Sequence, residues 1–63
     1  MEFLVEHKGY FTNAKDIGEN TIKCIICRDK EMSDLVDTFY MVIPEITKEE
    51  VENRIKIYID EAI

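Results

Sequence analysis

Residues 47–62 have the sequence TKEEVENRIKIYIDEA, which carries the clearest structural signal in the chain. Thr47 and Glu50 match a capping box, in which the Thr hydroxyl accepts from a first-turn amide and the Glu side chain reaches back to the Thr47 N–H. A stripe on one side of the resulting helix would hold Val51, Ile55, Tyr58, Ile59 and Ala62. Ile57 falls opposite this stripe. The pattern therefore predicts an amphipathic helix over residues 47–62, packed on a core through its stripe.

Three strands are predicted before this helix. Residues 2–11 alternate apolar and charged side chains, and Gly9 is a candidate bulge or bend within that strand. Residues 21–28 and 35–43 are rich in β-branched and aromatic residues, which favour strands. The polar and glycine-containing stretch 12–20 is predicted to be a loop.

The order strand, strand, strand, helix predicts a two-layer α+β fold. Short connections favour a three-stranded antiparallel β-meander with the C-terminal helix packed on one face. The 63 residues have room for a single domain, residues 1–63. A chain of this length buries only about 60% of its surface on folding, so oligomerisation is a common reinforcement.

One helix can cover only one face of such a sheet, so the other face is expected to expose apolar side chains. A bare apolar face is typical of an interface and predicts a homodimer or another protein partner. Aromatic residues are also common contacts in interfaces. The candidate partner-binding residues are Tyr10, Phe11, Ile25, Cys27, Tyr40, Val42 and Ile57.

The charge of the chain narrows the classes of partner. The formal net charge is −6, and the basic residues are scattered rather than clustered. This pattern disfavours direct binding to nucleic acid or to an anionic membrane, and it favours a protein partner with a basic surface. The sequence contains neither a long apolar span nor a signal-peptide pattern, so we expect a cytoplasmic protein.

Cys24 and Cys27 form a C-x-x-C pair inside a predicted strand. Zinc sites need four ligands, and this chain offers two cysteines and one histidine, His7. Residues three apart in a strand point to opposite faces, about 10 Å apart, beyond the reach of a disulfide. We therefore expect buried, reduced thiols and no cofactor or metal. The alternatives are a homo-oligomer linked by metal through Cys24, Cys27 and His7, and a minimal thiol/His enzyme.

These observations predict a small acidic, non-enzymatic protein-binding module without catalytic residues. It would act as a regulator or inhibitor, of a phage-type or bacterial kind, by occupying a basic surface of its partner.

Overall fold

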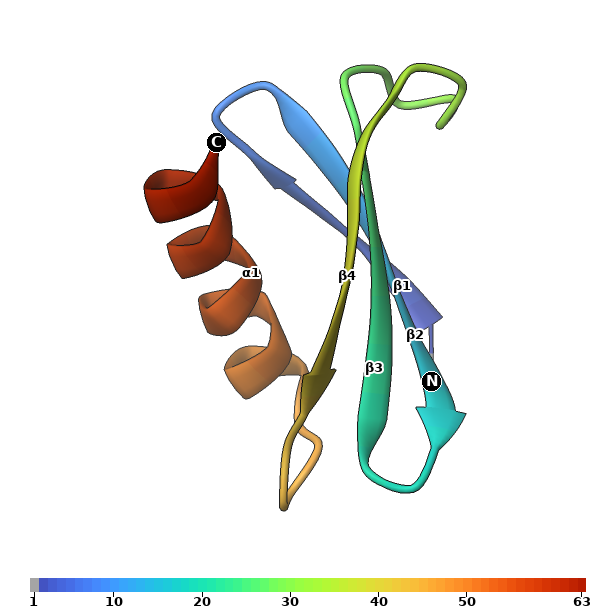
Figure 1. The fold of residues 1–63 in the computed structure, drawn as a ribbon, viewed down its shortest axis with the longest axis vertical. Coiled ribbons are helices and arrows are strands. Elements are labelled where there is room, and N and C mark those ends of the chain that lie inside the picture. The colour runs from blue at the N-terminus through green and yellow to red at the C-terminus, as the bar shows by residue number, and fades with distance from the viewer. Residues whose placement is uncertain (1) are drawn as a thin grey trace.

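The computed structural model describes residues 2–63, which form one antiparallel sheet with a helix on one of its faces (Figure 1). The sheet has the order β1-β2-β3-β4, with β1 at Glu2–His7, β2 at Tyr10–Gly18, β3 at Thr21–Cys27 and β4 at Leu35–Val42. The helix α1 spans Lys48–Ala62. The predicted two-layer α+β meander with a C-terminal helix is confirmed.

The sheet has four strands, so the prediction of three was wrong in this detail. Lys8 and Gly9 have φ values of 53° and 81°, and they form a two-residue turn that pairs His7 with Tyr10. Such a turn, with both residues at positive φ, suits the twist of a β-hairpin. Gly9 therefore ends a strand rather than bending one. The stretch predicted to be a loop, residues 12–20, is mostly strand β2.

Residue alternation along the strands separates two faces of the sheet. We call the face that packs on α1 the inner face and the opposite one the outer face. On the inner face, Val5 lies opposite Thr12 and Thr12 opposite Ile26, while Ala14 lies opposite Cys24. Together with α1 and the β4–α1 link, these strands form a core of Val5, Ala14, Ile22, Cys24, Ile26, Ile43, Val51, Ile55 and Ile59.

The helix begins largely as its sequence predicts. The Thr47 hydroxyl accepts from the Glu50 backbone N–H at 3.2 Å. The Glu50 carboxylate accepts from Arg54 Nε at 2.7 Å, so it serves the helix surface instead of returning to the N-cap. Every member of the predicted stripe is at least partly buried except Ala62, which is exposed in the last turn. Ile57 is 55% exposed, on the side of α1 away from the core.

Replacing single isoleucines of α1 by alanine should distinguish a core position from a surface position by the loss in stability. Ile55 is fully buried, so Ile55→Ala should lower the free energy of unfolding by about 2–5 kcal/mol through lost burial and a cavity. Ile57→Ala is the matched control and should change it by no more than about 0.5 kcal/mol in the monomer. Urea unfolding at low protein concentration measures both. Equal losses would contradict the orientation of α1.

Thr12 places a hydroxyl in the centre of the core. It is fully buried, and within residues 2–63 its Oγ1 has no hydrogen-bond partner. An unsatisfied buried polar group costs about 1–3 kcal/mol, so Thr12→Val, which has nearly the same shape, should raise the free energy of unfolding by roughly 1 kcal/mol or more. Thermal and urea unfolding provide the measurement. A loss of stability would mean that an ordered water satisfies the hydroxyl.

Candidate protein-interaction surface

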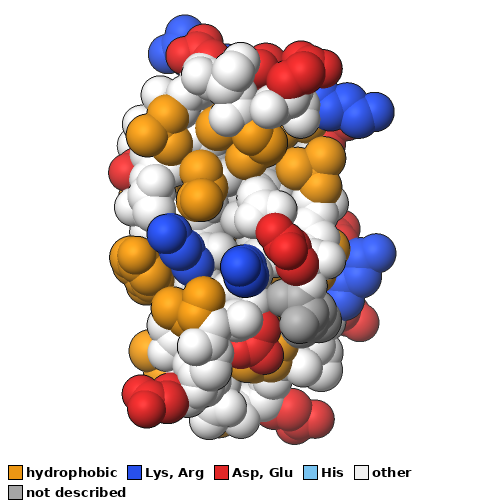
Figure 2. All heavy atoms as spheres, turned by 90° about the vertical axis from the view of Figure 1, so that its right-hand side faces the viewer, with side chains coloured by type: hydrophobic (Ala, Val, Ile, Leu, Met, Phe, Trp, Pro, Cys, Tyr) orange, Lys and Arg blue, Asp and Glu red, His pale blue; other side chains and the backbone are white. Residues whose placement is uncertain are grey.

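The outer face is a broad surface built from all four strands. The strand register aligns its side chains in rows: Leu4, Asn13, Ile25 and Thr38 form one row, and Glu2, Lys15, Lys23 and Tyr40 form the next. Figure 2 shows this face, with hydrophobic side chains in several clusters, two basic side chains near its centre with an acidic one beside them, and further acidic side chains toward both ends. No element of residues 2–63 packs over it as α1 packs over the inner face.

Large apolar side chains are exposed on the outer face. Leu4 is 43% exposed, Tyr40 59% and Val42 70%, while Phe11 and Ile25 on the same face are half-buried. Because they stand on neighbouring strands of one rigid sheet, they form a patch rather than scattered single residues. Contiguous exposed apolar area of this kind is typical of protein-binding surfaces.

The central row of the outer face carries two basic side chains and one acidic one, Glu2, which lies across from Lys15, in a protein that is acidic overall. Lys15 on β2 lies directly across from Lys23 on β3. Among residues 2–63, no carboxylate lies within 4.0 Å of either ammonium group. Like charges placed opposite each other oppose strand pairing. A partner that brings a carboxylate or carbonyl oxygen to this point would offset that cost.

The structure divides the candidate partner-binding residues among three places. Phe11, Ile25, Tyr40 and Val42 share the outer face, and Cys27 lies on the same face but is buried. Tyr10 packs against the core on the inner side. Ile57 stands on α1.

Two residues of the outer face escaped sequence reasoning: Leu4 and Lys15. Alternation along residues 21–28 already placed Lys23 beside Ile25, but the position of Leu4 and Lys15 relative to it depends on β2, which was predicted to be a loop. The signal was present in the alternation of Thr12 and Ala14 with Asn13 and Lys15, which is the period of a strand.

A second apolar surface lies beside the free edge of β4. An open groove of about 650 Å³ separates this strand from α1, with Phe39, Met41, Ile57 and Tyr58 in its lining. The backbone of α1 approaches β1 more closely than it approaches the other strands, and the groove lies on the β4 side of the helix. The rings of Phe39 and Tyr58 stack at 3.8 Å and form part of its wall. The Tyr58 hydroxyl donates to Asp37 Oδ2 at 2.5 Å, and this bond raises the pKa of Tyr58.

The two thiols are separated and protonated. Cys24 is buried on the inner face, where burial raises its pKa to about 12. Cys27 is buried on the outer side, and its pKa is raised by burial and by Asp29 and Asp34. A thiol must lose its proton to act as a nucleophile or to bind metal. Within residues 2–63, no group of three or more His, Cys, Asp or Glu side chains is placed to hold a metal ion.

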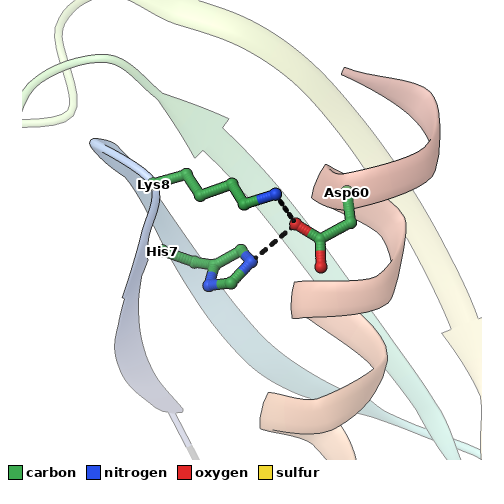
Figure 3. Close-up of polar contacts among 3 residues, drawn as sticks. All are labelled: His7, Lys8 and Asp60. Atoms are coloured by element: carbon green, nitrogen blue, oxygen red, sulfur yellow. Dashed lines mark hydrogen bonds and ion pairs between the residues drawn. The ribbon is translucent and has the colours of Figure 1, made fainter.

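His7 belongs to a polar contact that ties two elements together (Figure 3). Its Nε2 lies 2.8 Å from Asp60 Oδ1, and Lys8 Nζ lies 2.7 Å from the same oxygen. Because a carboxylate only accepts, the imidazole N–H donates. The bonds from Lys8 and then His7 hold the pKa of Asp60 below its ordinary value. The contact also brings positive charge to the C-terminal turn of α1, which has no basic residue of its own.

Comparisons of the chain with family models, with curated proteins and with solved structures gave no significant match. No helix within the described residues is long and apolar enough to cross a membrane. The interpretation of the surfaces therefore rests on their geometry and chemistry.

The Asp60 contact should make stability depend on pH in the acid range. Since the pKa of Asp60 is lowered from 3.8 by folding, its contribution is complete above that value and is lost as the pH falls through the lower folded pKa. Asp60→Asn should therefore be less stable than the parent at neutral pH, and the difference should shrink in acid.

Urea unfolding at neutral and at strongly acidic pH measures this effect. Glu61→Gln is the control, because Glu61 is the neighbouring carboxylate and lies outside the contact. A stability difference between Asp60→Asn and the parent that is the same at every pH would contradict the contact.

Proposed function

We propose that the protein is a non-enzymatic protein-binding module whose contact surface is the outer face of the sheet. The observation that carries the proposal is the patch of Leu4, Phe11, Ile25, Tyr40 and Val42, which α1 leaves bare. A protein that binds there acts on its partner by occupying a surface, so a regulatory or inhibitory role follows.

The size of the face suits this role. A standard protein–protein interface buries about 800 Å² on each partner, which is about a fifth of the 4072 Å² accessible surface of this chain. One broad face of a two-layer domain can supply that area. The strands hold the patch rigid, so little conformational entropy is lost when it binds.

The charges of the chain suit a partner whose surface is basic overall and has an acidic or carbonyl group at its middle. The net charge of −6 favours approach to a surface that is basic overall, because such fields accelerate association. Lys15 and Lys23 at the centre of the face favour an acidic or carbonyl group at the middle of the partner's surface. A basic rim around such a group would complement both features.

The state of the reactive side chains supports binding rather than catalysis. Cys24 and Cys27 are buried thiols with raised pKa values, and neither lies beside His7 in a hydrogen bond. His7 is held by Asp60. A thiol enzyme would need a thiolate with a base in reach, and a metal-linked oligomer would need its ligands on one accessible surface.

The test compares two apolar-to-lysine changes at positions of matched exposure. Leu4 lies on the outer face at 43% exposure, and Ile63, at the C-cap of α1, is 44% exposed. Tagged parent, Leu4→Lys and Ile63→Lys are used to recover proteins from the native cell. We expect a partner that the parent and Ile63→Lys recover and that Leu4→Lys loses.

The complex should also weaken as salt is added, because its electrostatic attraction is screened. Recovery of the same proteins by all three forms would place binding elsewhere and overturn the use of the outer face. Recovery of no partner by the parent would count against a binding module as such.

A further inference from the structure

The two edges of the sheet are built differently. The β1 edge carries Glu2 and Glu6, and charged side chains of this kind prevent unwanted strand pairing. In β4 the only charged residue is Asp37, whose carboxylate accepts from Tyr58 and from the Thr38 backbone N–H. The remainder of the β4 edge is uncharged and contains no proline.

The free backbone groups of β4 can be identified from one hydrogen bond. The Ile43 N–H donates to Asn20 O at 2.8 Å, so residue 43 directs its polar groups toward β3. Successive residues of an antiparallel strand alternate in this direction. Thr38, Tyr40 and Val42 therefore direct their N–H and C=O groups away from β3, to the free edge. The bond from Thr38 N–H to the Asp37 side chain, at 2.8 Å, agrees with this orientation.

Exposed apolar side chains flank this edge on both sides. Tyr40 and Val42 lie on its outer side, at 59% and 70% exposure, and Ile57 lies across the groove on its inner side, at 55%. A further strand added to β4 would bury all three and would satisfy the outward groups of Tyr40 and Val42, while the Thr38 N–H already has the Asp37 carboxylate as its acceptor. The edge therefore fits an extended segment with uncharged side chains on both of its faces.

We infer that the segment is β4 of a second copy of this chain, paired antiparallel about a twofold axis at Tyr40. The pairing would join two four-stranded sheets into one of eight strands. It places Tyr40 opposite Tyr40, Thr38 opposite Val42 and Phe39 opposite Met41 of the second copy. All three outward residues of each copy then exchange hydrogen bonds, for which the Thr38 N–H leaves the Asp37 carboxylate, and no charged side chain lies between Thr38 and Val42.

Self-complementarity favours the second copy as occupant. A strand that pairs about a twofold axis presents the same donors and acceptors to its mate, so the interface closes on itself. A register centred on Tyr40 pairs the outward backbone groups of the edge better than a register centred on either neighbouring residue. A register centred on Phe39 would require Val36 to pair, and Val36 lies at the irregularity opposite Ile26 and Cys27. A register centred on Met41 would require Pro44 to pair, and Pro44 has no N–H.

The charges along the groove also suit a twofold axis. Arg54 and Glu61 lie on either side of Ile57 on α1. The helices of the two copies run in opposite directions across the axis, so Arg54 of one copy is directed toward Glu61 of the other. The outer faces of the two copies become continuous, so Leu4, Phe11 and Ile25 of the proposed contact surface stay accessible while Tyr40 and Val42 are partly covered. The pairing does not rest on that function.

The decisive measurement is amide exchange by NMR across a range of protein concentrations, together with sedimentation. In the monomer the N–H groups of Tyr40 and Val42 face solvent. We expect a dimer at high concentration in which the exchange of both amides slows as the concentration rises. Higher salt should favour this dimer, since it screens the repulsion between two chains of charge −6. A complex with a basic partner would respond to salt in the opposite direction.

Thr38→Pro and Thr38→Ala form the matched pair of variants. Proline removes an outward donor but leaves the β3–β4 ladder intact, whereas alanine keeps the donor. We expect Thr38→Ala to dimerise and Thr38→Pro to be monomeric. If Thr38→Pro fails to fold, amide exchange of the parent still decides the matter.

Three results would overturn the pairing. The first is a parent chain that stays monomeric at millimolar concentration. The second is a dimer in which the Tyr40 and Val42 amides exchange at the same rate at every concentration, which would place the contact on another surface. The third is a folded Thr38→Pro variant that dimerises as well as Thr38→Ala.

Discussion

The packing of Val51, Ile55 and Ile59 against the inner face of the sheet is the interaction on which the rest of the structure depends. Each fully buried aliphatic side chain contributes about 1.5–3 kcal/mol, and the two cysteines of this chain are free, so no disulfide shares that role. A single helix has a single stripe. Once that stripe is committed to the inner face, the outer face remains open, and so does any part of the inner face that α1 does not reach.

The position of α1 over the sheet explains why the open regions lie where they do. Lys8 and His7, at the β1–β2 turn, hold Asp60 in the last helical turn, and α1 lies nearer to β1 than to the other strands. On the opposite side an open groove lies between β4 and α1, bridged by the stacked rings of Phe39 and Tyr58 and by the bond from Tyr58 to Asp37. Polar contacts thus tie α1 to the β1–β2 turn through Asp60 and to β4 through Tyr58.

The sequence predicted those parts of the fold that depend on neighbouring residues. The capping box at Thr47 and the helical stripe are local patterns, and the structure contains both. The turn at Lys8 and Gly9 was missed because a lysine at positive φ has no sequence signature, and Gly9 alone also fits a bulge. That one error concealed β2 and, with it, the register. Ile25, Tyr40 and Val42 could still be assigned to one face by alternation within β3 and β4, but the pairing of Lys15 with Lys23 could not.

The net charge of the chain and the charges at each surface act at different stages of binding: the first on the approach of a partner, the second on the contact itself. A total of −6 acts over long range and determines which partners approach, at a strength that salt reduces. Contact chemistry is set by the groups that meet: Lys15 and Lys23 with apolar neighbours on the outer face, and backbone donors and acceptors on the β4 edge. Between Thr38 and Val42 the edge carries no charged side chain to favour or oppose a mate. Association there depends on hydrogen bonds and buried apolar area, against the repulsion of the whole chains.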